Sequence, residues 1–251
     1  MHRSHTLILV AICLLAACLA LSSCAGEAVP DPDPKPALPS EPMEDLRMRM
    51  VDEQIAARGI TNEAVLEAFR TVPRHLFVPS SVQHLAYADG AQVIGFGQTI
   101  SQPYIVALMT DRARPSREAR VLEVGTGSGY QAAILGELFG DVYTIEILPE
   151  LGRRAKRTLA DQKYTNVTVR IGDGYDGWPE EAPFDAIVVT AAPSTIPRPL
   201  MEQLAEGGRL VIPVGDRSQD LMVLTRHGDD YQRELVAGVL FVPMTGKAQT
   251  E

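Results

Sequence analysis

Cysteine is scarce in this 251-residue chain, and all three cysteines, Cys13, Cys18 and Cys24, lie within the first 24 positions. Residues 25–251 therefore carry no thiol. This absence excludes a disulfide, a cysteine nucleophile and a cysteine metal ligand from the part of the chain that can fold as a globular domain. Any chemistry in that domain must depend on other residue types.

Positive charge is also in short supply, because 23 Lys and Arg residues stand against 32 Asp and Glu residues, a formal net charge of −9. Residues 1–24 contain one charged side chain, Arg3, so the rest of the chain has 22 basic and 32 acidic residues, a net charge of −10. An acidic chain argues against general binding to nucleic acid or to anionic lipid headgroups. His75, His84 and His227 lack metal-ligand spacing, so no metal is expected.

The first 24 residues have the pattern of an export signal. Arg3 precedes an apolar run over residues 7–21, which has the length of a signal-peptide core and is short for a membrane span. The following LSSC, residues 21–24, resembles a bacterial lipobox, which implies cleavage before Cys24 and a diacylglyceryl group on its thiol. Residues 1–24 are thus predicted to be a lipoprotein-type signal peptide. It would anchor the protein in the cell envelope, on the periplasmic face where there are two membranes.

Two alternatives remain open, namely an ordinary secretory signal and an uncleaved anchor that leaves the domain in the cytoplasm. Residues 25–42, AGEAVPDPDPKPALPSEP, are rich in proline and acidic residues, and such a segment cannot form a helix or a sheet interior. We expect a semi-extended linker there. Residues 43–251 are predicted to form one domain, which is long enough to bury a core.

Within this domain, short apolar segments alternate with amphipathic ones. The expected strands cover residues 119–125, 141–147, 166–173, 184–192, 209–215, 220–227 and 234–244, and the expected helices cover residues 129–140, 149–162 and 198–208. Near-continuous apolar strands alternating with helices are typical of a parallel sheet covered on both faces. No helix separates the last strands, so the sequence predicts an α/β, doubly wound, mostly parallel sheet with an antiparallel edge.

Helical spacing of apolar residues also predicts an N-terminal helical extension ahead of the sheet. The expected elements are a helix over residues 43–58, a helix that begins at Thr61 or Asn62 and ends at residue 70, a loop over residues 78–102 and a helix over residues 103–112. Gly59 is expected to end the first helix and Pro103 to open the third.

The strongest motif is LEVGTGSGYQ, residues 122–131, in which Gly125, Gly127 and Gly129 stand between a predicted strand and a predicted helix. Glycines there allow a tight turn and a close backbone approach to a ligand, which the free N–H groups of the helix start can also contact. Gly127, Gly129 and Ala132 also satisfy the G-x-G-x-x-A spacing of dinucleotide-binding proteins. A nicotinamide cofactor, and a turn without any ligand, therefore remain open on this motif alone.

Two acidic residues end the next two predicted strands. Glu146 lies 21 residues after Gly125, and a carboxylate at that strand end can accept hydrogen bonds from both hydroxyls of a ribose. Asp173 and Gly174 follow the third strand, where the carboxylate can accept from the exocyclic amine of an adenine and the glycine leaves space for the ring. The carboxyl ends of parallel strands share one edge of the sheet, so these features predict a site for an adenosine-containing ligand.

Longer stretches resemble the protein-L-isoaspartate O-methyltransferase family. They are VLEVGTGSGYQAAIL, GDGYDGW, APFDAIVVTAAP and GFGQTISQPYIVALM, with TISQPY, RHLFVP and FVPMTG the most specific parts, and together they run from about residue 51 to residue 246. The resemblance implies the Rossmann-like fold of S-adenosylmethionine-dependent methyltransferases. It also implies that the ligand is S-adenosyl-L-methionine rather than a nicotinamide cofactor, and that the substrates are isoaspartyl-containing proteins and peptides.

The same resemblance assigns candidate site residues. Those expected to bind the cofactor are Glu123, Gly125, Thr126, Gly127, Ser128, Gly129, Glu146, Asp173 and Gly174. Ser101 matches the family's active-site serine, with Thr99 beside it; the alternative for Ser101 is a helix cap ahead of Pro103. The substrate α-carboxylate is ionised at neutral pH, with a pKa near ~3.5, so it needs no strong base. We therefore expect Ser101 to orient the carboxylate by a hydrogen bond.

Two other functions are compatible with the same fold. One is a methyltransferase that acts on another carboxylate or on a small molecule, and the other is a non-catalytic binding module of the envelope. An exported methyltransferase also needs a cofactor that is made in the cytoplasm. The intact glycine loop and Glu146 favour an enzyme, and we expect it to be a monomer.

Overall fold

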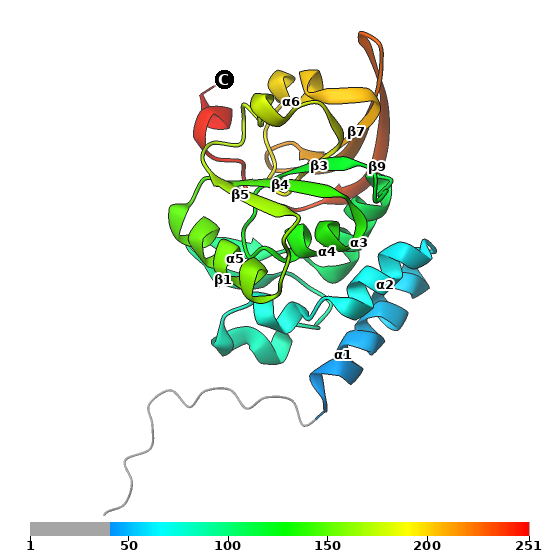
Figure 1. Cartoon of the computed structure of the whole chain (residues 1–251), viewed down its shortest axis with the longest axis vertical. Helices are drawn as coiled ribbons and strands as arrows, with labels where there is room; N and C mark the ends of the chain where they lie inside the picture. Colours follow the sequence, from blue (N-terminus) through cyan, green and yellow to red (C-terminus); the bar gives the residue numbers. More distant parts are fainter. Residues whose placement is uncertain (1–40, 251) are drawn as a thin grey trace, which may run out of the picture. The chain divides into compact units, whose positions relative to one another are not determined.

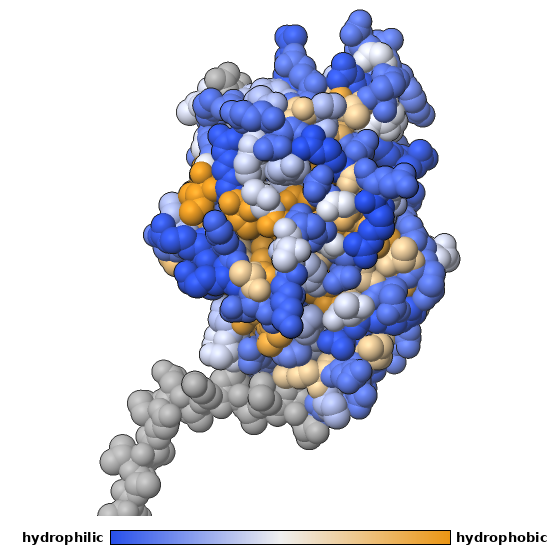
Figure 2. Space-filling view, in the orientation of Figure 1, coloured by the Kyte–Doolittle hydropathy of each residue, from blue (hydrophilic) through white to orange (hydrophobic). Residues whose placement is uncertain are grey.

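The structure, a computed structural model, describes residues 41–250 (Figure 1). The predicted signal peptide, and the predicted linker apart from Glu41 and Pro42, lie outside the described residues. Among residues 41–250, no helix is both long enough and apolar enough to cross a membrane. The face seen in Figure 2 is largely hydrophilic, with apolar residues visible in smaller areas between the polar ones.

A seven-stranded sheet has the order β5-β4-β3-β6-β7-β8-β9. The strands are β3 (Arg120–Val124), β4 (Asp141–Glu146), β5 (Val167–Ile171), β6 (Phe184–Val189), β7 (Leu204–Val214), β8 (Gln219–His227) and β9 (Asp230–Val239). Strands β5, β4, β3, β6 and β7 pair in parallel, whereas β8 pairs antiparallel with both β7 and β9. The predicted doubly wound sheet with an antiparallel edge is confirmed.

The sheet is covered on both faces. The helices that follow its parallel strands are α4 (Tyr130–Leu138), α5 (Pro149–Asp161) and α6 (Arg198–Glu202). In Figure 1, α4 and α5 lie on one side of the sheet and α6 lies on the other. Val121 belongs to the hydrophobic cluster that contains α4, and its neighbour Leu122 belongs to the cluster that contains α6. Since successive strand residues point to opposite faces, β3 is buried on both sides.

The predicted N-terminal helical extension is present. Helix α1 (Met43–Arg49) continues through a π-helical turn, η1 (Met50–Ile55), and a 3₁₀ turn, η2 (Ala56–Arg58), and then ends at Gly59, whose φ of 94° suits glycine. Helix α2 (Glu63–Thr71) is capped by Asn62, whose side chain accepts a hydrogen bond from the Ala64 N–H. Helix α3 (Pro103–Arg112) begins and ends as expected.

The loop predicted over residues 78–102 is wrong in part. This region contains the short helix η4 (Ser80–Leu85), preceded by η3 (Arg74–Phe77), and the hairpin of β1 (Gln92–Gly95) and β2 (Gln98–Ile100). The hairpin turns at Phe96 and Gly97, which have φ values of 56° and 72°. Strands of four and three residues are too short to give a clear alternating pattern, whereas the positive-φ turn is typical of tight hairpins.

Two C-terminal elements also differ from their predicted bounds. The helix expected over residues 198–208 ends at Glu202, and β7 begins at Leu204, because this segment pairs with β6 around a register shift. The strand expected over residues 234–244 is β9, which begins at Asp230 after a tight turn from β8 and ends at Val239. Residues 240–244 leave the sheet, where Pro243 could not donate to a ladder.

Candidate active site

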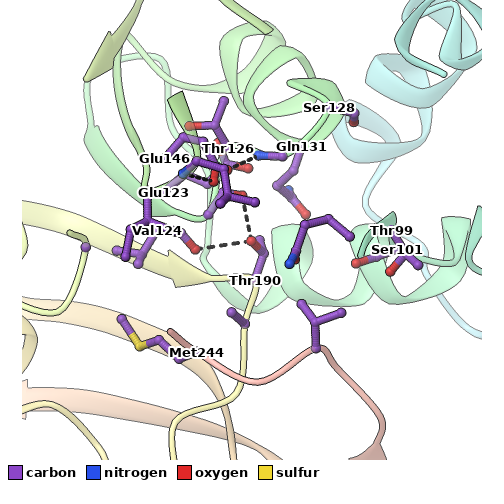
Figure 3. A pocket seen from close by; sticks show the side chains of 18 of the residues that line it. Thr99, Ser101, Glu123, Val124, Thr126, Ser128, Gln131, Glu146, Thr190 and Met244 are labelled. Carbon is purple, nitrogen blue, oxygen red and sulfur yellow. Dashed lines mark hydrogen bonds between the residues drawn. The ribbon is translucent and has the colours of Figure 1, made fainter. Parts of the chain in front are cut away.

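A cavity opens at the carboxyl ends of the parallel strands (Figure 3). It is lined by nine of the predicted site residues: Thr99, Ser101, Glu123, Gly125, Thr126, Gly127, Ser128, Glu146 and Gly174. Gly129 and Asp173 are not among its lining residues. Residues that are far apart in the sequence thus meet at the sheet edge predicted for a ligand.

The loop after β3 turns sharply around Gly125. This residue has a φ of 102°, and a Cβ built on it would lie 2.3 Å from Thr190 Oγ1 at the end of the neighbouring strand β6. Thr190 Oγ1 lies 2.7 Å from the Gly125 carbonyl oxygen, to which it donates a hydrogen bond. Gly129 serves a different purpose, because it forms the N-cap of α4 and faces Ala155 and Leu159 of α5. Gly125 thus allows the sharp turn, and Gly129 allows α4 and α5 to pack closely.

Glu146 connects this loop to β4. Its Oε2 accepts a hydrogen bond of 2.7 Å from the Gly127 N–H, and its Oε1 accepts one of 2.9 Å from the Leu148 N–H. The side chain is buried at the cavity wall. Each carboxylate oxygen has more than one lone-pair site, so Glu146 can also accept from ligand hydroxyls while its geometry is fixed by the two amides.

Glu123 is a second acid in the same wall, and it is fully buried. Its Oε2 accepts a hydrogen bond from the Thr144 hydroxyl, which lies 2.6 Å from the Thr126 hydroxyl. Its Oε1 has no hydrogen-bond partner within residues 41–250. Burial raises the pKa of Glu123 to about 8, although the Thr144 hydrogen bond lowers it, and the charge of Glu146 raises it further. At neutral pH Glu123 is therefore mainly a neutral, protonated carboxyl group, whose Oε1 has no hydrogen-bond partner among the described residues.

Asp173 and Gly174 differ in their surroundings. Asp173 Oδ1 accepts from the Tyr175 N–H at 2.9 Å, and Oδ2 accepts from the Lys247 N–H at 2.8 Å, so the carboxylate joins the loop after β5 to the C-terminal segment. Gly174 lines the cavity against Val124, and a Cβ on it would lie 2.4 Å from Val124 Cγ1. The space beside Val124 thus requires glycine, whereas contact of Asp173 with an adenine amine stays a prediction.

Thr99 and Ser101 lie across the cavity from Glu123 and Glu146 (Figure 3). The N-cap of α3 is Gln102 and no side chain caps it, so the alternative reading of Ser101 as a helix cap is wrong. Within the described part of the chain, the Ser101 carbonyl oxygen accepts a hydrogen bond, but no partner is found for the hydroxyl. That hydroxyl is free to contact a ligand.

Sequence reasoning missed several lining residues, among them Gln131, Thr190 and the segment of residues 242–245. Met244 N–H donates to the Ala192 carbonyl oxygen at 2.7 Å, and this contact brings the segment to the cavity. The only sequence signal for the segment was its membership of FVPMTG, since its apolar character predicted a strand. Residues 41–250 contain no group of three or more His, Cys, Asp or Glu side chains placed to hold a metal.

A glycine-rich turn and an acid at the end of the next strand of a doubly wound sheet are typical of nucleotide-binding proteins. The fold is that of the S-adenosylmethionine-dependent methyltransferases. The model of the protein-L-isoaspartate(D-aspartate) O-methyltransferase family matches residues 45–249. The chain belongs to this family.

Individual relatives agree with this assignment. The protein-L-isoaspartate O-methyltransferase of Picosynechococcus sp. is 55% identical over 207 residues, which cover 82% of this chain and 93% of the relative. That of Gloeobacter violaceus is 54% identical over 204 residues, which cover 80% and 100%. A Plasmodium falciparum structure, described as a protein-L-isoaspartate O-methyltransferase in complex with S-adenosyl-L-homocysteine, has a TM-score of 0.71 at 25% identity and covers 79% of this chain and 98% of its own.

The importance of the close contact between Gly174 and Val124 for ligand binding can be tested with a matched pair of variants. In Gly174→Ala the new methyl group would collide with Val124, so the cavity wall must shift, and we expect the Kd for S-adenosyl-L-homocysteine to rise about tenfold or more. Gly172→Ala is the control, because its nearest neighbour would be Arg170 Nε at 3.8 Å. Isothermal titration calorimetry measures both. Equal affinity of the two variants for S-adenosyl-L-homocysteine would contradict a role of Gly174 in the wall of the ligand site.

The buried Glu123 predicts a pH-dependent stability. Its folded-state pKa of about 8 lies above the ordinary 4.5, so between these values the folded chain holds a proton that the unfolded chain releases. The contribution of Glu123 to the free energy of unfolding therefore decreases as pH rises through this window. We expect Glu123→Gln to gain at least about 1 kcal/mol relative to the wild type between pH 5 and pH 8, measured by urea unfolding. A difference that does not change with pH would refute this.

Proposed function

We propose that this cavity is the site at which the chain transfers a methyl group from S-adenosyl-L-methionine to the free α-carboxylate of L-isoaspartyl residues in damaged proteins and peptides, with the chain acting as a monomer. One observation carries this proposal. In this chain, which belongs to the family, Glu146 and the glycine loop lie on one side of the cavity, and the hydroxyls of Thr99 and Ser101 lie on the other.

The residues present fit the methyl donor. Glu146 can accept from ribose hydroxyls. The carboxyl group of Glu123, whose Oε1 is unpartnered in the described part of the chain, can form a hydrogen bond with a polar group of the ligand. Gly174 packs directly against Val124 in the cavity wall, so a side chain at this position would displace a wall that a flat ring can contact. When bound, S-adenosyl-L-methionine supplies a methyl group that is activated by the positive charge on sulfur.

Ser101 is the orienting residue in this proposal. The incoming carboxylate is already ionised at neutral pH, so the chain need only hold an oxygen in line with the methyl group, at about 3–3.5 Å. The Ser101 hydroxyl donates a hydrogen bond to the other carboxylate oxygen, and Thr99 is beside it as a second donor. The apolar lining, including Val124, Leu148 and Met244, excludes water, which favours a step in which opposite charges are lost. The backbone amide nitrogen then attacks the carbonyl of the methyl ester and expels methanol, which gives a succinimide whose hydrolysis returns some normal aspartate.

The sequence also supports a location for this activity in the cell envelope. We infer that Cys24 is lipidated and that the domain acts on envelope proteins at the periplasmic face. The support is the LSSC motif after an apolar run of signal-peptide length, followed by a linker rich in proline. A domain that stays in the cytoplasm is the competing possibility.

The role of Ser101 predicts a partial loss of activity. We expect Ser101→Ala to lower kcat/KM for an isoaspartyl peptide about 10- to 100-fold, because an orienting hydrogen bond is lost while the nucleophile belongs to the substrate. The assay follows labelled methyl transfer to the isoaspartyl peptide and to its normal aspartyl twin. The wild type should methylate the isoaspartyl peptide alone, and Ser81→Ala, at an exposed position, should match the wild type.

Either of two results would oppose these assignments. Transfer to neither peptide by the wild type, despite cofactor binding, would oppose the enzymatic proposal. Complete loss of activity in a folded Ser101→Ala variant would mean that the serine does more than orient the carboxylate.

Lipidation predicts a change in mass and in partitioning. In bacterial cells the mature protein should begin at Cys24, carry a diacylglyceryl group detectable by mass spectrometry and sediment with membranes. Cys24→Ala should lack the lipid and lose lipoprotein-type processing. An unmodified Cys24 in the native protein would refute the anchor and leave the proposed reaction unaffected.

A further inference from the structure

Arg74, in the RHLF turn of η3, is a buried cation behind Ser101. Its side chain has no exposed surface. Its Nη2 donates to the Ser101 carbonyl oxygen at 2.7 Å, and its Nε donates to the Ala86 carbonyl oxygen at 2.7 Å. Its guanidinium carbon lies 4.8 Å from the ring centroid of Tyr130, which itself lines the cavity. Arg74 therefore connects two parts of the cavity wall.

This cation has no acidic partner. Within residues 41–250, no carboxylate oxygen lies within 4.0 Å of the Arg74 guanidinium, and neither Nη1 nor the Tyr130 hydroxyl has a hydrogen-bond partner. Burial lowers the pKa of Arg74 to about 10, which still leaves it protonated at neutral pH. A buried charge without a counter-charge is unfavourable, and an apolar side chain of similar volume would pack there at lower cost. Packing alone does not account for an arginine at this position.

As far as the structure describes the chain, the cavity wall near Ser101 has no positively charged side chain of its own. Among the described residues that line it there are two acids, Glu123 and Glu146, and neither Lys nor Arg. A substrate carboxylate that approaches Ser101 would thus meet no cation in the wall itself. The Arg74 guanidinium contacts the backbone carbonyl of Ser101 rather than the cavity itself. It lies in a buried region, where charges interact more strongly than they do in water.

We propose that Arg74 is a positioning residue that fixes the main chain at Ser101 and, through its positive charge, makes this side of the cavity selective for a carboxylate over a neutral group. This inference rests on the proposed function, because it assumes that the substrate carboxylate lies at Ser101. The two N–H groups of the planar guanidinium fork, Nε–H and Nη2–H, hold the backbone carbonyls of Ala86 and Ser101 in place. The positive charge of the guanidinium provides the selectivity.

Two peptides separate these effects. One carries an isoaspartyl residue with its free α-carboxylate, and the other carries the same residue as its α-carboxamide. Their affinities for the full chain are measured by competition in the presence of S-adenosyl-L-homocysteine. In Arg74→Met we expect the affinity for the carboxylate peptide to fall about tenfold or more, while that for the carboxamide peptide and for S-adenosyl-L-homocysteine changes less than about twofold.

Arg74→Lys tests the fork separately. It keeps the charge but cannot make both hydrogen bonds, so we expect it to keep most of the preference for the carboxylate peptide while kcat falls at unchanged KM. It also provides the test if Arg74→Met does not fold. Arg209→Met is the control, because Arg209 is likewise buried and donates to a backbone carbonyl, at Arg112, which does not line the cavity, whereas Arg74 donates to Ser101, which does. It should alter stability without altering the preference.

Distinct outcomes overturn distinct claims. Equal losses for the two peptides in Arg74→Met, or no loss for either, would refute the selectivity. Wild-type kcat in Arg74→Lys would refute the role of the fork, and loss of carboxylate preference in that variant would refute the role of the charge. Failure of the wild type to methylate the isoaspartyl peptide would refute the proposed function instead.

Discussion

The carboxylate of Glu146 is the interaction on which the rest of the site depends. One of its oxygens accepts from the amide of Gly127 in the loop after β3, and the other accepts from the amide of Leu148 at the start of α5. A single acid at the end of β4 therefore fixes the glycine loop and the following helix relative to each other. Burial is the main cause of the raised pKa of Glu123, and the charge of Glu146 raises it further, so Glu146 affects both the geometry and the electrostatics of this wall.

The two sides of the cavity have opposite electrostatic character. Glu146 and the carboxyl group of Glu123 form one side, and the charge of Glu146 suits a ligand with cationic groups and hydroxyls. Thr99 and Ser101 form the other side, and Arg74 lies behind it as the buried cation proposed to favour an anion. A reaction between a cationic methyl donor and a carboxylate needs this division, because each reactant must be held by charge of the other sign until the charges are lost. Net charge of the chain alone could not predict it.

Local sequence patterns predicted most of the sheet because its central parallel strands are apolar on both faces, as Val121 and Leu122 of β3 illustrate. The loop at Gly125 and the acid Glu146 were predictable for a related reason, since both follow directly from the ends of such strands. The β1–β2 hairpin was not predictable in this way. Its seven strand residues are too few for an alternating pattern, yet Thr99 lies in this hairpin and Ser101 directly follows it at the cavity.

The remaining errors come from contacts between distant segments, which no local pattern contains. The apolar residues 240–244 predicted a strand, yet they leave the sheet and bond to Ala192 instead. Asp173 belongs to a GDG motif that predicts a ligand contact, which stays a prediction; both of its oxygens accept from backbone amides, one of them at Lys247. A carboxylate oxygen has more than one lone-pair site, so Asp173 can hold the C-terminal segment and also contact a ligand. Asp173 therefore contributes to the site by holding that segment, whose residues 242–245 complete the cavity wall.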